Sequence, residues 1–254
     1  MDKVFLKLLH KFQSLNLGEV IDFDRFNQYS ITHHSTNIEG STLTATETRL
    51  LLEEQLTPSG KPLAHSLMVK DHFEALRFTL QAADDRAPLT VGFLQKINSL
   101  VLKNTGAIYR TLSGDIDSSL GAFRKSNVSA GTRFFPNFTK VENLTNSLVE
   151  KLNYQLENAQ TTEAQLELSF DSHFELVSIH PFYDGNGRTS RLLMNYFQQY
   201  FKLPLAIVFS ENKAAYFDAL EAARNTENME PFRDFMVGQY AKQLNAEIQK
   251  FEQL

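Results

Sequence analysis

The strongest constraint on the fold is a helical spacing of apolar residues that restarts after each of several helix-start signals. Thr44 and Glu47 are spaced as a capping box. In such a box the Thr44 hydroxyl accepts a hydrogen bond from the Glu47 amide, and the Glu47 carboxylate accepts one from the Thr44 amide. The same signal recurs at Thr139–Glu142 and Thr162–Gln165, and Thr90 is the expected N-cap of another helix. Apolar residues follow each signal at helical spacing. The sequence therefore predicts a mostly α-helical chain.

Four further segments carry the same helical period without a capping box. They are residues 63–84, 188–200, 216–223 and 232–251. Only Leu120–Phe138, which lacks that period and holds two glycines and a proline, predicts a β-hairpin. We therefore expect an all-α protein, a helical bundle of about eight helices with one small hairpin, folded as a single domain.

Charge and composition exclude several classes of partner. The net charge is -5 and the acids and bases are interspersed, so no basic stripe favours nucleic acid. The chain has no cysteine, which excludes disulfides and thiolate metal sites. Lys7, His10 and Lys11 interrupt the first apolar run too early for a signal peptide, and no run approaches the roughly 20 residues of a membrane span. We expect a cytoplasmic protein that contacts no membrane.

The segment HPFYDGNGRTSRLL, beginning at His180, carries most of the chemistry. Its glycines, Gly185 and Gly187, lead into a helix and leave backbone amides free to bind an anion. Arg188 and Arg191 lie in the first turn of that helix, where each cation costs about 0.3 to 1 kcal/mol unless an anion sits between them. A polyphosphate would explain both arginines, because guanidinium groups suit phosphate oxygens.

Two further side chains complete this pattern. Asp184, next to the glycines, would repel a polyphosphate unless a divalent cation such as Mg²⁺ lay between them. His180 can accept a proton near neutral pH. Taken one at a time, these residues fit a plain glycine elbow between two core helices. Together they favour phosphoryl or nucleotidyl transfer to a hydroxyl, although the chain has no Walker A loop and no kinase signature.

This segment resembles the signature of the Fic-domain family, H-x-F-x-[D/E]-G-N-G-R-x-x-R. Every specified position matches, namely His180, Phe182, Asp184, Gly185, Asn186, Gly187, Arg188 and Arg191. The resemblance implies an all-α Fic fold and transfer of AMP from ATP to a Ser, Thr or Tyr hydroxyl of a target protein. It also implies a division of the 1–254 domain into an N-terminal helical part, residues 1–85, and a Fic core, residues 86–254.

The resemblance also assigns a role to each signature residue. His180 would deprotonate the target hydroxyl, Asp184 would hold Mg²⁺, and Phe182 would anchor the loop in the core. For the nucleotide, Asn186 and the amides of Gly185 and Gly187 would bind the α-phosphate, Arg188 the β-phosphate and Arg191 the γ-phosphate.

Two other segments resemble parts of the family's site. Residues 120–138 occupy the position of the family's flap, a hairpin that pairs with an extended stretch of the target protein. Within it, Val128, Ser129, Ala130 and Gly131 would border the nucleotide. Tyr216 and Phe217 match positions where family members carry aromatics near the base and ribose. Tyr216 also lies on the apolar stripe of its own helix, so core packing is an equal alternative for that residue.

Ser35–Gly40 resembles the family's inhibitory motif, [S/T]-x-x-x-E-[G/N]. The resemblance implies that Glu39 pairs with Arg191 and prevents the γ-phosphate from reaching it, since both anions use the same guanidinium fork. The alternative is that Glu39 and Gly40 simply end one helix before the Thr44 cap starts the next.

We therefore expect an autoinhibited, Mg²⁺-dependent protein adenylyltransferase that uses ATP. One alternative is the reverse reaction, with Glu39 aligning a water that removes AMP from a modified protein. Another is a non-catalytic module that holds a partner in the cleft and senses nucleotide. The sequence determines neither the target protein nor the trigger that displaces Glu39, and a homo-oligomer is compatible with it.

Overall fold

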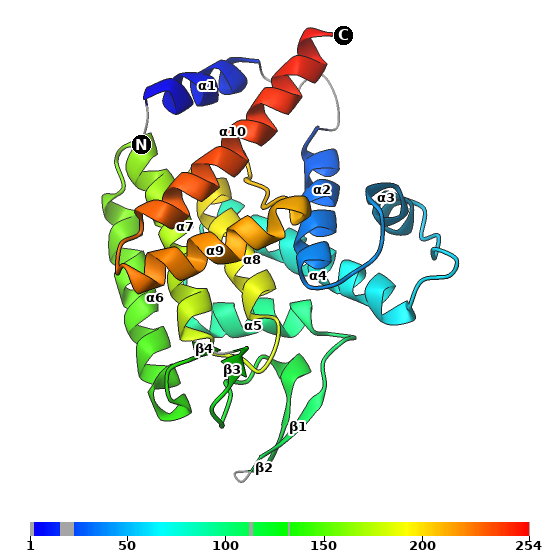
Figure 1. The fold of residues 1–254 in the computed structure, drawn as a ribbon, viewed down its shortest axis with the longest axis vertical. Coiled ribbons are helices and arrows are strands. Elements are labelled where there is room, and N and C mark those ends of the chain that lie inside the picture. Colours follow the sequence, from blue (N-terminus) through cyan, green and yellow to red (C-terminus); the bar gives the residue numbers. More distant parts are fainter. Residues whose placement is uncertain (1–2, 16–22, 112–113, 132, 254) are drawn as a thin grey trace.

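The computed structural model describes residues 3–15, 23–111, 114–131 and 133–253, and helices dominate these ranges (Figure 1). The described α-helices are α1 (Lys3–Ser14), α2 (Phe23–Ile38), α3 (Ala45–Glu53), α4 (Leu63–Asp84), α5 (Val91–Val101), α6 (Val141–Asn158), α7 (Thr162–Ile179), α8 (Asn186–Tyr200), α9 (Lys213–Asn225) and α10 (Glu230–Glu252). The all-α prediction is confirmed. The predicted count of about eight was too low, because it omitted α1 and α2.

The two omitted helices escaped the prediction for different reasons. In α1, Phe5, Leu9 and Phe12 are buried at helical spacing, so its apolar stripe was present in the sequence. In α2 the buried face includes Ser35 and Thr36, which carry no apolar signal. A helix that buries polar side chains shows only a weak apolar period in its sequence.

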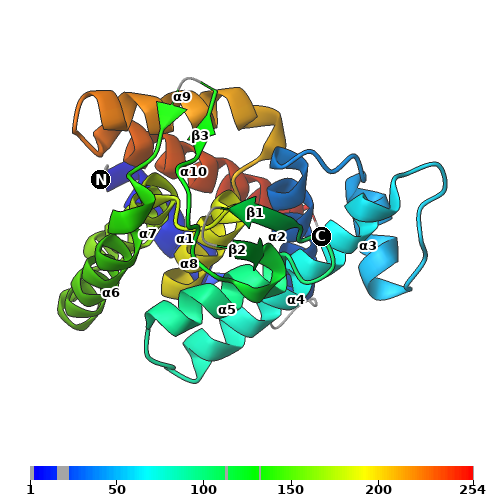
Figure 2. The ribbon, with the colours of Figure 1, turned by 90° about the horizontal axis from the view of Figure 1, so that it is seen from below.

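Within the described ranges two hairpins interrupt the helices, where the sequence predicted one. The first, β1 (Ile108–Thr111) with β2 (Gly114–Asp117), was not predicted. The second, β3 (Ser129–Ala130) with β4 (Arg133–Phe134), pairs Ser129 with Phe134 and lies inside the predicted flap, all of which except residue 132 is described. Both hairpins lie at the same end of the molecule (Figure 1), and the segment carrying β3 extends toward α9 (Figure 2).

The predicted caps are partly confirmed. Thr44 accepts from the Glu47 amide at 3.2 Å and Glu47 accepts from the Thr44 amide at 2.8 Å, as a capping box requires. Thr90 caps α5 through the Phe93 amide, as predicted. The capping box predicted at Thr162 was wrong by one residue, because Thr161 has the extended backbone of an N-cap and accepts from the Ala164 amide.

The capping box predicted at Thr139 was also wrong. Asn137 accepts from the Thr139 amide and caps a short 3₁₀ turn, Phe138–Lys140, from which α6 continues without a side-chain cap. An asparagine two residues upstream therefore takes the role that we assigned to the threonine.

Helix α8 is the centre of the fold. It packs against α7 and α4 and also contacts α5 and α2, so most of its side chains are buried. Apolar residues of α4, α5 and α8 form one core cluster, while α1, α7, α9 and α10 supply most of a second. Because the N-terminus of α8 follows the HPFYDG loop, both clusters hold that loop in place. No helix within the described ranges is long and apolar enough to cross a bilayer.

Candidate active site

The loop between α7 and α8 begins with a histidine in an unusual backbone conformation. His180 has φ 53° and ψ 60°, the left-handed region, and its amide donates to the Leu176 carbonyl at 3.0 Å to close α7. Pro181 prevents the helix from continuing. Gly185 has φ 75° and precedes the first residue of α8, so the chain turns sharply at both ends of the loop, as the elbow interpretation predicted.

Asn186 holds this loop in shape rather than facing open space. Its side-chain oxygen accepts from the Phe182 amide at 3.0 Å and its nitrogen donates to the Phe182 carbonyl at 2.9 Å. Phe182 is 1% exposed and packs against Phe123, which agrees with an anchoring role. The amides of the first turn of α8 have no intrahelical acceptor and are left for a ligand.

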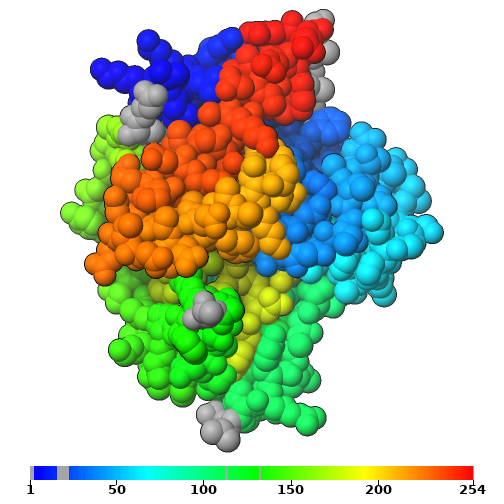
Figure 3. Space-filling view, in the orientation of Figure 1, coloured from blue at the N-terminus to red at the C-terminus, as the bar shows by residue number. Residues whose placement is uncertain are grey.

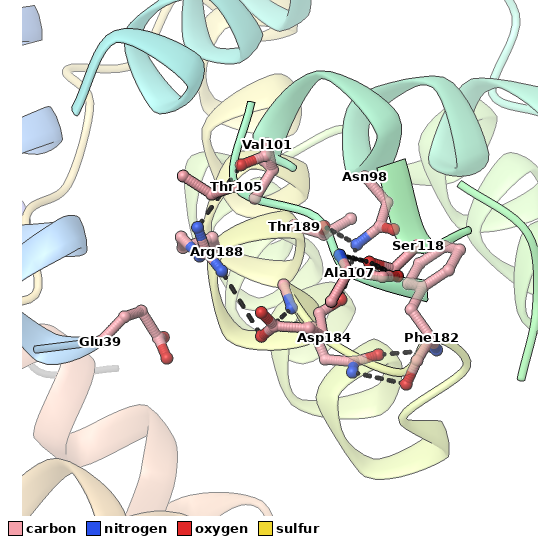
Figure 4. A network of polar contacts seen from close by, with 12 residues as sticks. Glu39, Asn98, Val101, Thr105, Ala107, Ser118, Phe182, Asp184, Arg188 and Thr189 are labelled. Carbon is pink, nitrogen blue, oxygen red and sulfur yellow. Dashed lines mark hydrogen bonds and ion pairs between the residues drawn. The ribbon is translucent and has the colours of Figure 1, made fainter. Parts of the chain in front are cut away.

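Asn98, from α5, braces the loop through its side chain (Figure 4). Its side-chain nitrogen donates to the Asp184 carbonyl at 3.0 Å and to the Thr189 hydroxyl at 3.1 Å. A Cβ added at Gly185 would lie 2.8 Å from the same nitrogen, so both the positive φ and this close approach require glycine. No local pattern indicates a role for Asn98, because its partners are more than 80 residues away.

Arg188 is buried under the loop at 2% exposure. Its guanidinium lies 3.4 Å from the Val101 carbonyl and 3.4 Å from Asp184 Oδ1, while its Nε has no partner among the described residues (Figure 4). Half of the Asp184 side chain is exposed, and Oδ1 accepts from the Gly185 amide at 2.6 Å. Arg188 and Asp184 are therefore fixed next to the glycines, with Asp184 facing outward.

Arg191 and Glu39 form an ion pair across the site. Arg191 Nη2 donates to Glu39 Oε1 at 2.7 Å, and the guanidinium also donates to the Ser35 hydroxyl and carbonyl. Burial alone would raise the pKa of Glu39, but the positive charges of Arg191 and Arg188 outweigh it and hold that pKa below its usual value. Glu39 is therefore ionised at neutral pH.

His180 is covered by an aromatic side chain of the flap. The Phe135 ring stacks on the imidazole with centroids 3.7 Å apart and an angle of 18°. Burial lowers the pKa of His180 to about 4; the Val177 carbonyl opposes this shift and the Arg133 guanidinium adds to it. The imidazole is neutral at pH 7 and can accept a proton without first losing one.

Glu39, Phe135, His180 and Arg191 line one cleft of about 620 Å³ between the flap and α9. Of the residues predicted from sequence, it brings together Glu39, Ala130, His180, Gly187, Arg191, Tyr216 and Phe217. Val128, Ser129, Gly131, Asp184, Gly185, Asn186 and Arg188 are not in its lining. The space-filling view shows the flap surface directly beside α9 (Figure 3). A larger groove of about 820 Å³ lies between α3 and α4 and contains none of these residues.

Tyr216 belongs mainly to the core, one of the two alternatives for that residue. It is 1% exposed, its hydroxyl lies 2.8 Å from His173 Nε2, and Arg191 Nη1 donates to it at 3.5 Å. Phe217 is 49% exposed and lines the cleft. Phe135 was missed as a site residue, although it lies inside the predicted hairpin, because nothing local indicates which side chain of a hairpin turns inward.

Comparisons with known proteins agree with these observations. Residues 88–198 match the Fic/DOC family. The protein adenylyltransferase Fic of Aedes aegypti is 32% identical over 205 residues, covering 80% of this chain and 38% of the relative. The protein of the same name from Drosophila melanogaster is 31% identical over 205 residues, covering 80% of this chain and 39% of the relative. The chain thus spans less than two fifths of the length of these two relatives.

Solved structures share the fold. A Fic-domain-containing signaling protein from Bacteroides thetaiotaomicron superposes with a TM-score of 0.81 at 25% identity, covering 95% of this chain and 94% of that one. Fic-1 from C. elegans superposes with a TM-score of 0.77 at 25% identity, covering 97% of this chain and 70% of that one. Together with the complete signature at His180–Arg191, these matches show that residues 88–198 of the chain form a Fic/DOC-family domain.

Proposed function

We propose that this protein is a protein adenylyltransferase that transfers AMP from ATP to a hydroxyl side chain of a target protein and is held inactive by Glu39. The observation that carries the proposal is the cleft itself, which places a neutral histidine, Gly187 of the α8 N-terminus and the Glu39–Arg191 pair in one space. The relatives named protein adenylyltransferase support the same chemistry.

His180 is proposed to take the proton from the target hydroxyl. The hydroxyl oxygen then attacks the α-phosphorus of ATP, and the bond from that phosphorus to the oxygen bridging the β-phosphate breaks. Diphosphate leaves, AMP stays on the target, and His180 releases its proton to solvent. The amides at the start of α8 stabilise the charge that develops on the phosphorus oxygens.

The remaining nucleotide contacts are assigned from the signature residues, of which Gly187 and Arg191 line the cleft and Arg188 does not. We assign the α-phosphate to the amides of Asn186 and Gly187, because the Gly185 amide already donates to Asp184. The β-phosphate is assigned to Arg188 and the γ-phosphate to Arg191. The base end is assigned to Phe217, to the Tyr216 edge and to residues 128–131 of the flap. Ala130 and Phe217 line the cleft, which supports that end of the assignment.

Asp184 is a suitable ligand for Mg²⁺. Its carboxylate is half exposed beside the glycine amides, and Oδ2 has no hydrogen-bond partner among the described residues. The described part of the chain contains no group of three or more acidic or histidine side chains that could enclose a metal ion. A single carboxylate suits Mg²⁺, which keeps waters and takes its other ligands from phosphates. When bound there, Mg²⁺ would neutralise phosphate charge.

Inhibition by Glu39 rests on competition for one guanidinium. Arg191 is 3% exposed and already donates to Ser35 as well as Glu39, so a γ-phosphate can reach it only after Glu39 leaves. The docked position of α2 thus keeps Arg191 occupied.

The test is to measure labelled AMP transferred from ATP with Mg²⁺, on the protein itself and in a lysate. Glu39→Gly should raise transfer by roughly 10- to 100-fold, the factor that corresponds to releasing one charge-assisted bond. Glu54→Gly, at the exposed end of α3, is the matched control and should not change transfer. Adding His180→Ala to Glu39→Gly should abolish it. No gain in Glu39→Gly, or full labelling without His180, would disprove the proposal.

A further inference from the structure

Arg124 is a buried cation with no acidic partner in the part of the chain that the structure describes. It lies between the 3₁₀ turn Ser118–Leu120 and β3, and only 2% of its surface is exposed. Among the described residues no carboxylate pairs with its guanidinium, and every acceptor it uses is a backbone carbonyl. A buried charge without a counter-ion is costly, so a residue of this kind is expected to have a specific task.

The guanidinium of Arg124 joins three separate places in the chain. Its Nε donates to the His180 carbonyl at 2.8 Å, Nη1 donates to the Ser126 carbonyl at 3.0 Å, and Nη2 donates to the Pro136 carbonyl. Its backbone amide also donates to the Pro181 carbonyl at 3.0 Å. Ser126 and Pro136 flank the β3–β4 hairpin on either side, so one side chain ties both ends of the flap to the candidate base.

The hydrogen bond from Arg124 to the His180 carbonyl stabilises an unfavourable backbone conformation. His180 is a non-glycine residue in the left-handed region, which L-residues rarely adopt. Its amide is fixed by Leu176 and its carbonyl by Arg124. Because both peptide groups of His180 are fixed, the direction of its Cα–Cβ bond is fixed as well. The position from which the imidazole ring extends is therefore also fixed.

Tyr183 makes a second, weaker connection that does not replace the first. Its hydroxyl accepts from the Lys125 amide at 3.1 Å and lies 3.0 Å from the Ser126 hydroxyl, while its ring stacks on Tyr109. These contacts hold the start of the flap and connect it to the β1–β2 hairpin. None of them reaches the Pro136 or His180 carbonyl; among the described residues, Arg124 alone hydrogen-bonds both.

We propose that Arg124 is a positioning residue that couples the flap to the orientation of His180. The inference rests on the proposed function, in which the flap holds the target hydroxyl and His180 deprotonates it. With Arg124 in place, the flap and the imidazole move as one unit, so a hydroxyl held by the flap stays at a constant distance from its base. Lysine cannot substitute, because an ammonium group has no planar fork to bind three divergent carbonyls.

The kinetic test uses Arg124→Lys and Arg124→Met in the Glu39→Gly background. We expect kcat for AMP transfer to fall roughly 10- to 100-fold, the loss that a misplacement of about 1 Å produces. The dissociation constant for Mg²⁺ and a nonhydrolysable ATP analogue should change much less than kcat does, because Arg124 itself contacts no nucleotide group and only residues 128–131 of the flap are assigned to the base end. Arg233→Lys is the matched control, because Arg233 binds Asp171 on α7 outside the cleft lining. It should lower the melting temperature without changing kcat.

A purely structural role predicts a different result. Loss of folded protein would reduce kcat and nucleotide-binding capacity in the same proportion, and Arg233→Lys would behave like Arg124→Lys. Either outcome would overturn the proposal, as would an unchanged kcat in Arg124→Met.

A second measurement keeps the inference testable if Glu39→Gly transfers no AMP and the proposed function fails. Amide hydrogen exchange compares flap residues 126–136 and the loop 181–185 with α4 in the same protein. Arg124→Met should accelerate exchange in the flap and the loop together and leave α4 unchanged. Faster exchange in the flap alone, or no change in either segment, would show that Arg124 does not couple them.

Discussion

Glu39 and Arg191 are 152 residues apart in the chain and 2.7 Å apart in space. A Cβ added at Gly187 would lie 2.6 Å from Glu39 Oε1, so the glutamate also closes over the start of α8. The C-terminal end of α2 therefore covers the place where the amides of α8 would bind phosphate. The site is assembled from both halves of the chain, and several measurable consequences follow from its geometry.

The stability that Glu39 provides should depend on pH in a defined direction. The pKa of Glu39 is lowered in the folded protein, so the ion pair stabilises the fold above pH 4.5, the ordinary value, and this stabilisation is lost as the pH falls through the folded-state pKa. At pH 7, Glu39→Gln should reduce the free energy of unfolding by about 1 to 3 kcal/mol. Urea denaturation from pH 7 down to acid should show the gap between the two proteins closing. A gap that widened toward acid would contradict the ion pair.

The rate of AMP transfer should fall only at low pH. Because the pKa of His180 is lowered to about 4, the imidazole stays neutral well below its ordinary value of 6.5. In the Glu39→Gly background, initial rates should be flat through neutral pH and fall near pH 4. Circular dichroism at each pH separates this effect from unfolding. An acid limb at 6.5 would show that burial does not control this histidine.

Removing the ring that covers His180 should move that acid limb upward. Phe135→Ala takes away the side chain stacked on the imidazole and admits water, so the pKa of His180 should shift from about 4 toward 6.5. Phe134→Ala is the matched control, because the Phe134 side chain belongs to the same hairpin but is 83% exposed. Its profile should coincide with that of the parent protein. Identical profiles for both variants would exclude Phe135 as the cause of the shift.

Two glycines of the flap region should respond differently to alanine. Gly121 and Gly131 both have positive φ, at 68° and 60°, so alanine at either position should cost about 1 to 2 kcal/mol of strain. At Gly121 the added Cβ would also lie 2.0 Å from the Gln95 carbonyl, whereas nothing lies within 4 Å at Gly131. Gly121→Ala should therefore be destabilised by about 1 to 3 kcal/mol more than Gly131→Ala in thermal or urea unfolding. An equal loss of unfolding free energy in the two variants would mean that the α5 backbone at Gln95 moves to accommodate the added Cβ.

Much of the helical fold could be predicted from the sequence because its signals are local. Thr44 and Thr90 cap helices through amides three residues away, and the apolar period of α4 or α8 is a property of one segment. The same locality explains the failures. Asn137 and Thr161 competed as caps with neighbouring threonines, and α2 buried polar groups for which only a distant partner could account.

The features of the candidate site also separate into those that local sequence predicts and those that depend on distant contacts. By itself the sequence determined the loop from His180 to Arg191, its turn at Gly185 and the family to which it belongs, because these depend on residue types at fixed short spacing. Resemblance alone linked Glu39 to Arg191. Only the tertiary structure decided that Asn98 braces the loop and that Phe135 covers His180. The same is true of Arg124, which connects the backbone of His180 to the flap. Those contacts join residues tens of positions apart, and their existence depends on how α5, α7 and the flap pack, which no local pattern encodes.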